Sequence, residues 1–156
     1  MNILDYLDND CIILELKQKN KKNTILGIIN HLVEKKKITK NDKKEISKAI
    51  FQREGMGSTA IGNHIAFPHA RTNSVKDIII CIGISKEGIE FDSLDQEPVN
   101  IVALLLSNQK EAGLHLKMLA FLARMLRDKY LVQRLKNAKT KEEVIGLLDK
   151  QQQAIS

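Results

Sequence analysis

The chain has 156 residues, of which 43% are hydrophobic and 28% charged, a balance typical of one globular domain. No apolar run approaches the roughly 20 residues that a membrane helix needs, and the start, MNILDYLDND, lacks the basic and apolar regions of a signal peptide. We therefore expect a cytoplasmic protein without stable membrane insertion. The net charge of +6 comes from lysine clusters without interleaved aromatic residues. We interpret these clusters as solvated helix faces and expect no nucleic-acid partner.

The first elements in chain order are a short strand and a helix. Residues 11–16 (CIILEL) form an apolar run that predicts the strand. Apolar residues at helical spacing within 25–33 predict an amphipathic helix with Asn23 as its N-cap. Cys11 and Cys81 each lie in an apolar strand-like run without CxxC spacing, so we expect buried, unreactive thiols and no zinc site.

A second helix and a glycine-rich loop follow. Apolar residues on one side of the segment 41–53 predict the helix, and either Thr39 or Asn41 can cap it. Residues 55–63 (GMGSTAIGN) contain three of the chain's eight glycines and predict a loop.

The central part of the sequence predicts the strands of a sheet. Residues 77–84 (DIIICIGI) and 99–106 (VNIVALLL) are almost continuously apolar, which is typical of central strands covered on both faces. Residues 88–91 (GIEF) predict a shorter strand between them. Strands mixed with helices in one domain indicate an α/β layered fold.

The rest of the chain predicts helices. An apolar stripe predicts a long helix over 111–127, and shorter helices are expected at about 129–137 and 140–149. We therefore predict one domain over 1–150 and a flexible tail over 151–156 (QQQAIS).

His69 is the first candidate for chemistry. It follows Pro68, whose ring fixes its own φ angle and biases Phe67 toward extended structure. A histidine on such a stiff, non-helical segment is well positioned, and its neutral imidazole is a competent nucleophile near pH 7. These residues alone leave a functional and a structural role for His69 equally open.

The surrounding residues allow both a functional and a structural interpretation. The loop supplies backbone N–H groups and the hydroxyls of Ser58 and Thr59, a set that can bind an anion, although a simple connection is the more common explanation. Arg53 either complements the end of its helix or binds phosphoryl oxygens. His115 shares the apolar stripe of the long helix, so it is either a buried structural histidine or a hydrogen-bond donor beside His69.

The run from Arg53 to Arg71, REGMGSTAIGNHIAFPHAR, resembles the active-site signature of enzyme IIA domains of the fructose/mannitol class. These domains belong to the bacterial phosphoenolpyruvate-dependent sugar phosphotransferase system. Further on, a Pro-Val strand start at 98–99 and a helix opening with His-Leu at 115–116 match the family pattern in the same order. The resemblance covers nearly the whole chain and implies the family's mixed β-sheet with helices on both faces.

The resemblance also implies a site and a function. His69 corresponds to the phosphorylated histidine, and Arg53 and His115 to its active-site neighbours. The adjoining phosphoryl-binding loop corresponds to Ser58, Thr59, Gly62 and Asn63. Family members accept a phosphoryl group from the carrier HPr or its nitrogen-branch relative. They pass it to a IIB component, or use it as a signal toward a regulated protein, and they need no metal or other cofactor.

Two departures and two alternative functions remain. His64 stands where the family usually has a small residue, and Phe67 replaces an aliphatic one. His64 can line the site, tune His69 or point outward, of which we favour the last, and Arg71 is a further candidate to line the site. One alternative is a metal-binding protein that uses His64, His69 and His115, although no nearby Cys or Asp completes a ligand set. The other alternative is a basic nucleic-acid-binding domain with steeply salt-dependent affinity.

Overall fold

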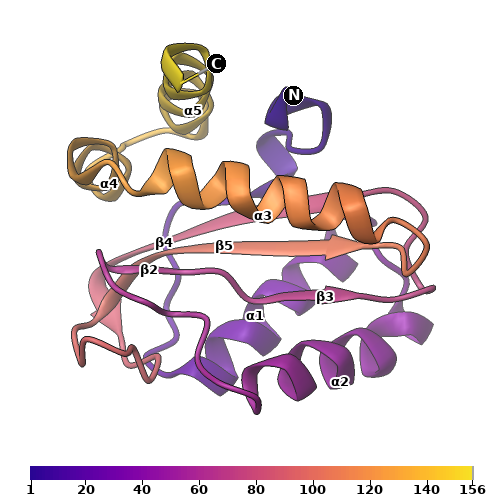
Figure 1. The fold of residues 1–156 in the computed structure, drawn as a ribbon. Coiled ribbons are helices and arrows are strands. Elements are labelled where there is room, and N and C mark those ends of the chain that lie inside the picture. Colours follow the sequence, from indigo (N-terminus) through magenta and orange to yellow (C-terminus); the bar gives the residue numbers. More distant parts are fainter. Residues whose placement is uncertain (156) are drawn as a thin grey trace.

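The computed structural model describes residues 1–155 as a five-stranded mixed sheet with helices on both faces (Figure 1). The predicted fold class is confirmed. In sheet order the strands are β1 (Ile12–Ile13), β4 (Ile79–Ile89), β5 (Val99–Ser107) and β2 (Ile65–Ala66), and β3 (His69–Arg71) follows β2 along the same edge of β5. The pair β4–β5 is antiparallel, whereas β1 runs parallel to β4 and both β2 and β3 run parallel to β5.

The two long central strands hold the core. Every residue of β5 is buried, as its continuous apolar run predicts, because helices cover both of its faces. The two strands expected at 77–84 and 88–91 are one strand, β4, with an irregular register between Ile84 and Ile89. Cys11 and Cys81 are 2% and 0% exposed, in agreement with the expected burial of both thiols.

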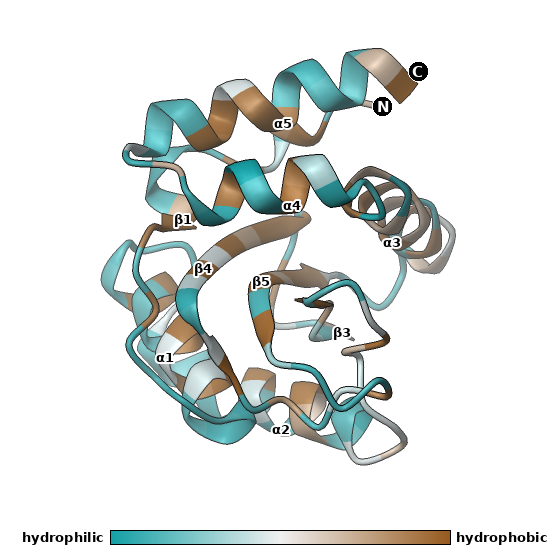
Figure 2. Cartoon of the chain, turned by 90° about the vertical axis from the view of Figure 1, so that its left-hand side faces the viewer, coloured by the Kyte–Doolittle hydropathy of each residue, from teal (hydrophilic) through white to brown (hydrophobic). Residues whose placement is uncertain are grey.

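The helices form two layers. One layer contains α1 (Lys21–Glu34) and α2 (Lys43–Glu54); the other contains α3 (Ala112–Leu126), α4 (Lys129–Lys136) and α5 (Lys141–Ile155) (Figure 1). Short 3₁₀ turns precede β1 and α2, at Ile3–Asp5, Asn9–Cys11 and Lys40–Asp42. Figure 2 shows the hydrophobic strands β4 and β5 between these layers, with hydrophilic residues along the outer surfaces of the helices. None of the helices in residues 1–155 is long and apolar enough to cross a membrane.

Several predicted boundaries near the amino terminus are corrected. The predicted strand 11–16 shrinks to two residues of β1. Helix α1 begins earlier than expected because Asn20, and not Asn23, caps it, by accepting a hydrogen bond from the Asn23 backbone N–H. Thr39 caps the 3₁₀ turn before α2, and Asn41 lies inside that turn.

The predicted flexible tail is also wrong for residues 151–155. They continue α5, and Gln152 is only 4% exposed. Its side-chain oxygen accepts a hydrogen bond of 2.9 Å from the Ile3 backbone N–H. This contact between the two ends of the chain gives the polar tail a partner that its own sequence does not reveal. Ser156 lies outside the described residues.

Candidate active site

His69 is the first residue of β3, and its ring is oriented by the backbone. Its Nδ1 lies 2.7 Å from the carbonyl oxygen of Phe67. Because a carbonyl oxygen can only accept, Nδ1 carries the proton, and the lone pair of the neutral ring is on Nε2. The strand itself is anchored by β5, because the Leu105 N–H donates to the Pro68 carbonyl at 3.0 Å. His69 therefore presents one defined nitrogen as a nucleophile.

The surroundings of His69 favour its neutral form. Burial, the largest cause, lowers the pKa of His69 below its ordinary value of 6.5, and the nearby positive charge of Arg53 lowers it further. The hydrogen bond to Phe67 and the charge of Glu54 oppose this shift. A lowered pKa leaves the imidazole uncharged and nucleophilic at neutral pH.

His115 lies beside His69 although 46 residues separate them in the sequence. It is near the start of α3, it is only 5% exposed, and its ring centroid is 5.4 Å from that of His69, with the planes tilted by 52°. Burial, followed by the charges of His69 and Arg71, lowers the pKa of His115 to about 4. Two neutral imidazoles thus share the site, and their Nδ1 atoms both face the protein, toward Phe67 and Ser107 respectively.

These histidines open into a cavity of about 430 Å³ between α2, β3 and the start of α3. Its lining comprises Ala49, Gln52, Arg53, Met56, His69, Ala70, Arg71, Gln109, His115, Leu116 and Leu119. Arg53 and Arg71 bring two positive charges to the lining, and no acidic side chain is among these residues. Such a lining favours a dianionic group.

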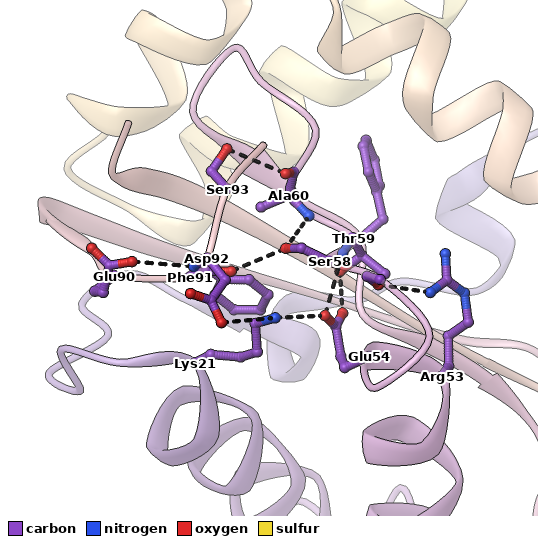
Figure 3. A network of polar contacts seen from close by, with 12 residues as sticks. Lys21, Arg53, Glu54, Ser58, Thr59, Ala60, Glu90, Phe91, Asp92 and Ser93 are labelled. Carbon is purple, nitrogen blue, oxygen red and sulfur yellow. Dashed lines mark hydrogen bonds and ion pairs between the residues drawn. The ribbon is translucent and has the colours of Figure 1, made fainter. Parts of the chain in front are cut away.

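A buried carboxylate fixes the loop that holds Arg53 (Figure 3). The Arg53 guanidinium donates to the Gly57 carbonyl at 2.8 Å. The carboxylate of Glu54, 4% exposed, accepts from the Thr59 N–H at 3.3 Å and from the Thr59 hydroxyl, and the ammonium of Lys21 is 3.1 Å away. Because Glu54 joins the two ends of the segment 55–58, it determines where the Gly57 carbonyl holds the guanidinium.

The sequence comparison establishes the family. Residues 5–151 match the model of the family "Phosphoenolpyruvate-dependent sugar phosphotransferase system, EIIA 2". The chain belongs to this family. The resemblance read from Arg53 to Arg71 is thereby confirmed.

Relatives of this IIA chain come from two branches. It is 32% identical, over 96% of its length, to the fructose-specific EIIABC component of the phosphotransferase system of Bacillus subtilis, of which it spans only 23%. A crystal structure of the nitrogen regulatory protein IIA-Ntr from Neisseria meningitidis matches 94% of the chain and 98% of that protein, with 28% identity and a TM-score of 0.85. The complex of enzyme IIAMTL with phosphorylated enzyme IIBMTL from Escherichia coli shares the fold, with a TM-score of 0.77, 23% identity and coverage of 91% and 96%.

The structure does not bring the predicted phosphoryl-binding loop of this IIA chain to the cavity. The Ser58 hydroxyl donates to the Phe91 carbonyl at 3.0 Å, and the Thr59 hydroxyl is bound to Glu54. Gly62 and Asn63 precede β2, at the end of that strand that lies away from β3. The Asn63 side chain donates to the carbonyl of Leu126, the last residue of α3, at 2.8 Å. The hydroxyls therefore stabilise the loop, and the part of it that reaches the cavity is Met56.

His64 and Arg71 have different positions. Arg71 lines the cavity and donates weakly to the Gln109 carbonyl at 3.5 Å. His64 does not line it; its Nδ1 is 2.8 Å from the Pro98 carbonyl. The three histidines of the metal-site alternative are therefore not gathered in one place. Among residues 1–155, no group of three or more His, Cys, Asp or Glu side chains is arranged to hold a metal ion.

Sequence reasoning missed three residues of the candidate site. Glu54 was present in the Arg-Glu pair of the signature, but its contacts with Lys21 and Thr59 depend on the tertiary structure. Ser107, which is fully buried against His115, was the first polar residue after the apolar run of β5. A hydroxyl at the end of a buried strand was the one signal available for it. Nothing in the local sequence marked Lys21.

Proposed function

We propose that this IIA chain is a phosphocarrier that accepts a phosphoryl group on Nε2 of His69. The observation that carries the proposal is the orientation of this ring. Its Nδ1–H is bound to the Phe67 carbonyl, which leaves the Nε2 lone pair for a cavity lined by two arginines and a second neutral histidine. The family to which the chain belongs supports a phosphotransferase role in general.

The proposed step is an in-line transfer from a phosphohistidine donor. The lone pair of Nε2 forms the new N–P bond while the N–P bond of the donor breaks, and the donor imidazole leaves with that electron pair. The transition state is loose and spreads charge over three equatorial oxygens, which Arg53 and Arg71 can stabilise. The Nδ1 proton stays in place, where the Phe67 carbonyl compensates the charge that develops on the ring.

The partners follow from the family. The donor is an HPr-type phosphocarrier, and the acceptor is a IIB component or a regulated protein; the IIAMTL–IIBMTL complex, which shares this fold, supports the IIB assignment. Met56 and Leu116 on the rim of the cavity are 80% and 67% exposed, and such apolar residues suit a contact that forms and dissociates at each transfer.

We place the protein in the cytoplasm, where phosphoenolpyruvate-dependent transfer takes place, and we expect no cofactor.

A reconstituted phosphorylation assay tests the proposal. The chain is mixed with radiolabelled phosphoenolpyruvate, enzyme I and HPr or its nitrogen-branch relative. We expect an acid-labile, alkali-stable adduct on the wild type and on His64→Ala, and no adduct on His69→Ala. Labelling of His69→Ala at the wild-type rate would show that the assignment is wrong.

The same labelled protein distinguishes the two branches. Added to purified IIB components, a sugar-branch protein loses its label to one of them at a rate that depends on the IIB concentration. A nitrogen-branch protein keeps its label and differs from the unlabelled form in its affinity for a regulated protein. The control is labelled chain without any acceptor, which reports spontaneous hydrolysis.

A further inference from the structure

Ser107 is a buried hydroxyl behind His115, one of the residues that line the cavity. It is the last residue of β5, it lies opposite Arg71 in the β3–β5 register, and it is 0% exposed. Its hydroxyl is hydrogen-bonded to Nδ1 of His115, eight residues further along the chain. The serine thus touches one of the two histidines of the site from the side opposite the cavity.

The direction of this hydrogen bond follows from counting donors and acceptors. A serine hydroxyl has one hydrogen to donate, and an imidazole nitrogen either donates or accepts. Within residues 1–155, Nδ1 of His115 is the one hydrogen-bond partner of the Ser107 hydroxyl, and full burial keeps water away from it. If Nδ1 carried a proton, the hydroxyl would accept it and leave its own hydrogen buried without an acceptor, an arrangement that proteins avoid. The hydroxyl therefore donates and Nδ1 accepts.

This direction determines the tautomer of His115. Burial and the charges of His69 and Arg71 keep its pKa near 4, so the ring is neutral at pH 7 and has one proton. With Nδ1 accepting from Ser107, that proton is on Nε2. The two nitrogens lie on different edges of the ring, so the Nε2 edge is the one left for the cavity that His115 lines.

We propose that Ser107 is a positioning residue that holds His115 as an Nε2–H donor toward the phosphoryl group carried by His69. This inference rests on the proposed function. An N–H directed at the phosphoryl oxygens stabilises their charge during transfer, whereas the other tautomer would direct a lone pair at them. His115 keeps its proton throughout, so the step needs no proton transfer to or from this ring.

Nuclear magnetic resonance tests the tautomer without any phosphoryl transfer. In the full chain labelled with ¹⁵N-histidine at pH 7, long-range ¹H–¹⁵N spectra distinguish a protonated from an unprotonated ring nitrogen. We expect His115 to be protonated on Nε2, and the Nδ1 resonance to move toward that of a nitrogen without a hydrogen bond in Ser107→Ala. In Ser107→Thr, which keeps the hydroxyl, the Nδ1 resonance stays near the wild-type position. Protonation of His115 on Nδ1 in the wild type would overturn the inference.

Transfer kinetics test the consequence. We expect Ser107→Ala to lower the rate of phosphorylation by on the order of tenfold, because the donor is no longer held in one orientation. Ser107→Thr should recover most of the rate. In a His115→Ala background, Ser107→Ala should have no further effect, because the serine acts through that histidine. The matched control is Ser85→Ala, which removes another buried strand hydroxyl, one that accepts from the Gly88 N–H, and it should leave the rate unchanged.

The outcomes separate the inference from the function on which it rests. If even the wild type takes no phosphoryl group, the proposed function fails, and the NMR measurement still decides the tautomer. If the wild type is phosphorylated but the effects of Ser107→Ala and His115→Ala multiply, Ser107 does not act through His115 and the inference is wrong.

Discussion

His64 and His69 are five residues apart, and their rings are held in the same way but lie in different surroundings. In each, Nδ1 contacts a backbone carbonyl oxygen, Pro98 at 2.8 Å for His64 and Phe67 at 2.7 Å for His69. His69 begins β3 and faces the cavity with His115. His64 comes before β2, has a φ of 61° and does not line the cavity.

The comparison shows that a hydrogen bond which orients a histidine does not by itself place it in a cavity suited to a phosphoryl group. What differs is the group that each Nε2 can meet. Around His69, the arginines and the second histidine come from α2, β3 and α3, which converge at one end of the sheet. His64 has an acidic neighbour instead, Asp95, whose pKa is lowered mainly by its hydrogen bond with Ser93 and to a smaller extent by His64. An acidic neighbour opposes the binding of a phosphoryl group.

The largest expected effect on the phosphorylation rate is at Arg53, which lines the cavity beside His69. Arg53→Ala removes a cation that lines the cavity, and we expect the phosphorylation rate to fall by about a hundredfold. Arg127→Ala is the matched control, because Arg127 caps the opposite end of α3, where its carbonyl accepts from Asn63. Rapid-quench labelling measures both rates. Equal rates for Arg53→Ala and wild type would show that Arg53 takes no part in the transfer.

A smaller effect on the phosphorylation rate is expected for Glu54, whose contacts with Lys21 and Thr59 fix the loop that holds Arg53. Glu54→Gln weakens the contacts with Lys21 and Thr59, and we expect about a tenfold lower rate and a loss of about 2 kcal/mol in the free energy of unfolding. In the Arg53→Ala background, the change in rate should disappear. The control is Asp8→Asn, which breaks an exposed pair with Lys37 and should cost less than about 1 kcal/mol. Urea denaturation measures the free energy of unfolding, and labelling measures the rate. If Glu54→Gln still lowered the rate in the Arg53→Ala background, Glu54 would not act through Arg53.

The pH dependence gives a more modest test. Since the pKa of His69 lies below 6.5, the nucleophilic neutral form persists as the pH falls through that value. With a pre-phosphorylated donor, the decrease in rate at low pH should therefore have its midpoint below pH 6.5. Because the Arg53 charge contributes to lowering this pKa, Arg53→Ala should move the NMR titration midpoint of His69 upward. A wild-type midpoint at or above 6.5 would contradict the expected desolvation.

The smallest effect is expected at the His64 end, and on stability alone. The Asn63 side chain donates to the carbonyls of Leu126 and Arg127 at 2.8 and 3.2 Å, and its φ is 56°. Asn63→Gly removes these hydrogen bonds without backbone strain and should cost about 1 kcal/mol. Asn63→Ala also introduces strain and should cost about 1 kcal/mol more. Thermal unfolding distinguishes the two variants, and both should be phosphorylated at the wild-type rate. A slower rate in either variant would show that Asn63 influences the transfer at His69.

Much of this fold and site was predictable from local patterns. Apolar stripes at helical spacing predicted α1, α2 and α3, and continuous apolar runs predicted the buried strand β5 and the first part of β4. These elements can be recognised from sequence because burying one face of a helix or strand imposes an apolar pattern on residues that are close together in the chain. The signature from Arg53 to Arg71 and the later His-Leu pair indicated Arg53, His69 and His115, and the structure gathers these three side chains around one cavity.

Only the tertiary structure decided the rest. The strands β2 and β3 have two and three residues, too few for a periodic pattern, and they exist through hydrogen bonds to β5 more than 30 residues away. Ser58 and Thr59, which were predicted to bind an anion, stabilise the loop instead, because their hydroxyls donate to the Phe91 carbonyl and the Glu54 carboxylate. Ser107 gained its place beside His115 in the same way. The chain itself determines which groups are available for chemistry, but a polar side chain contacts whichever donor or acceptor the fold brings within about 3 Å.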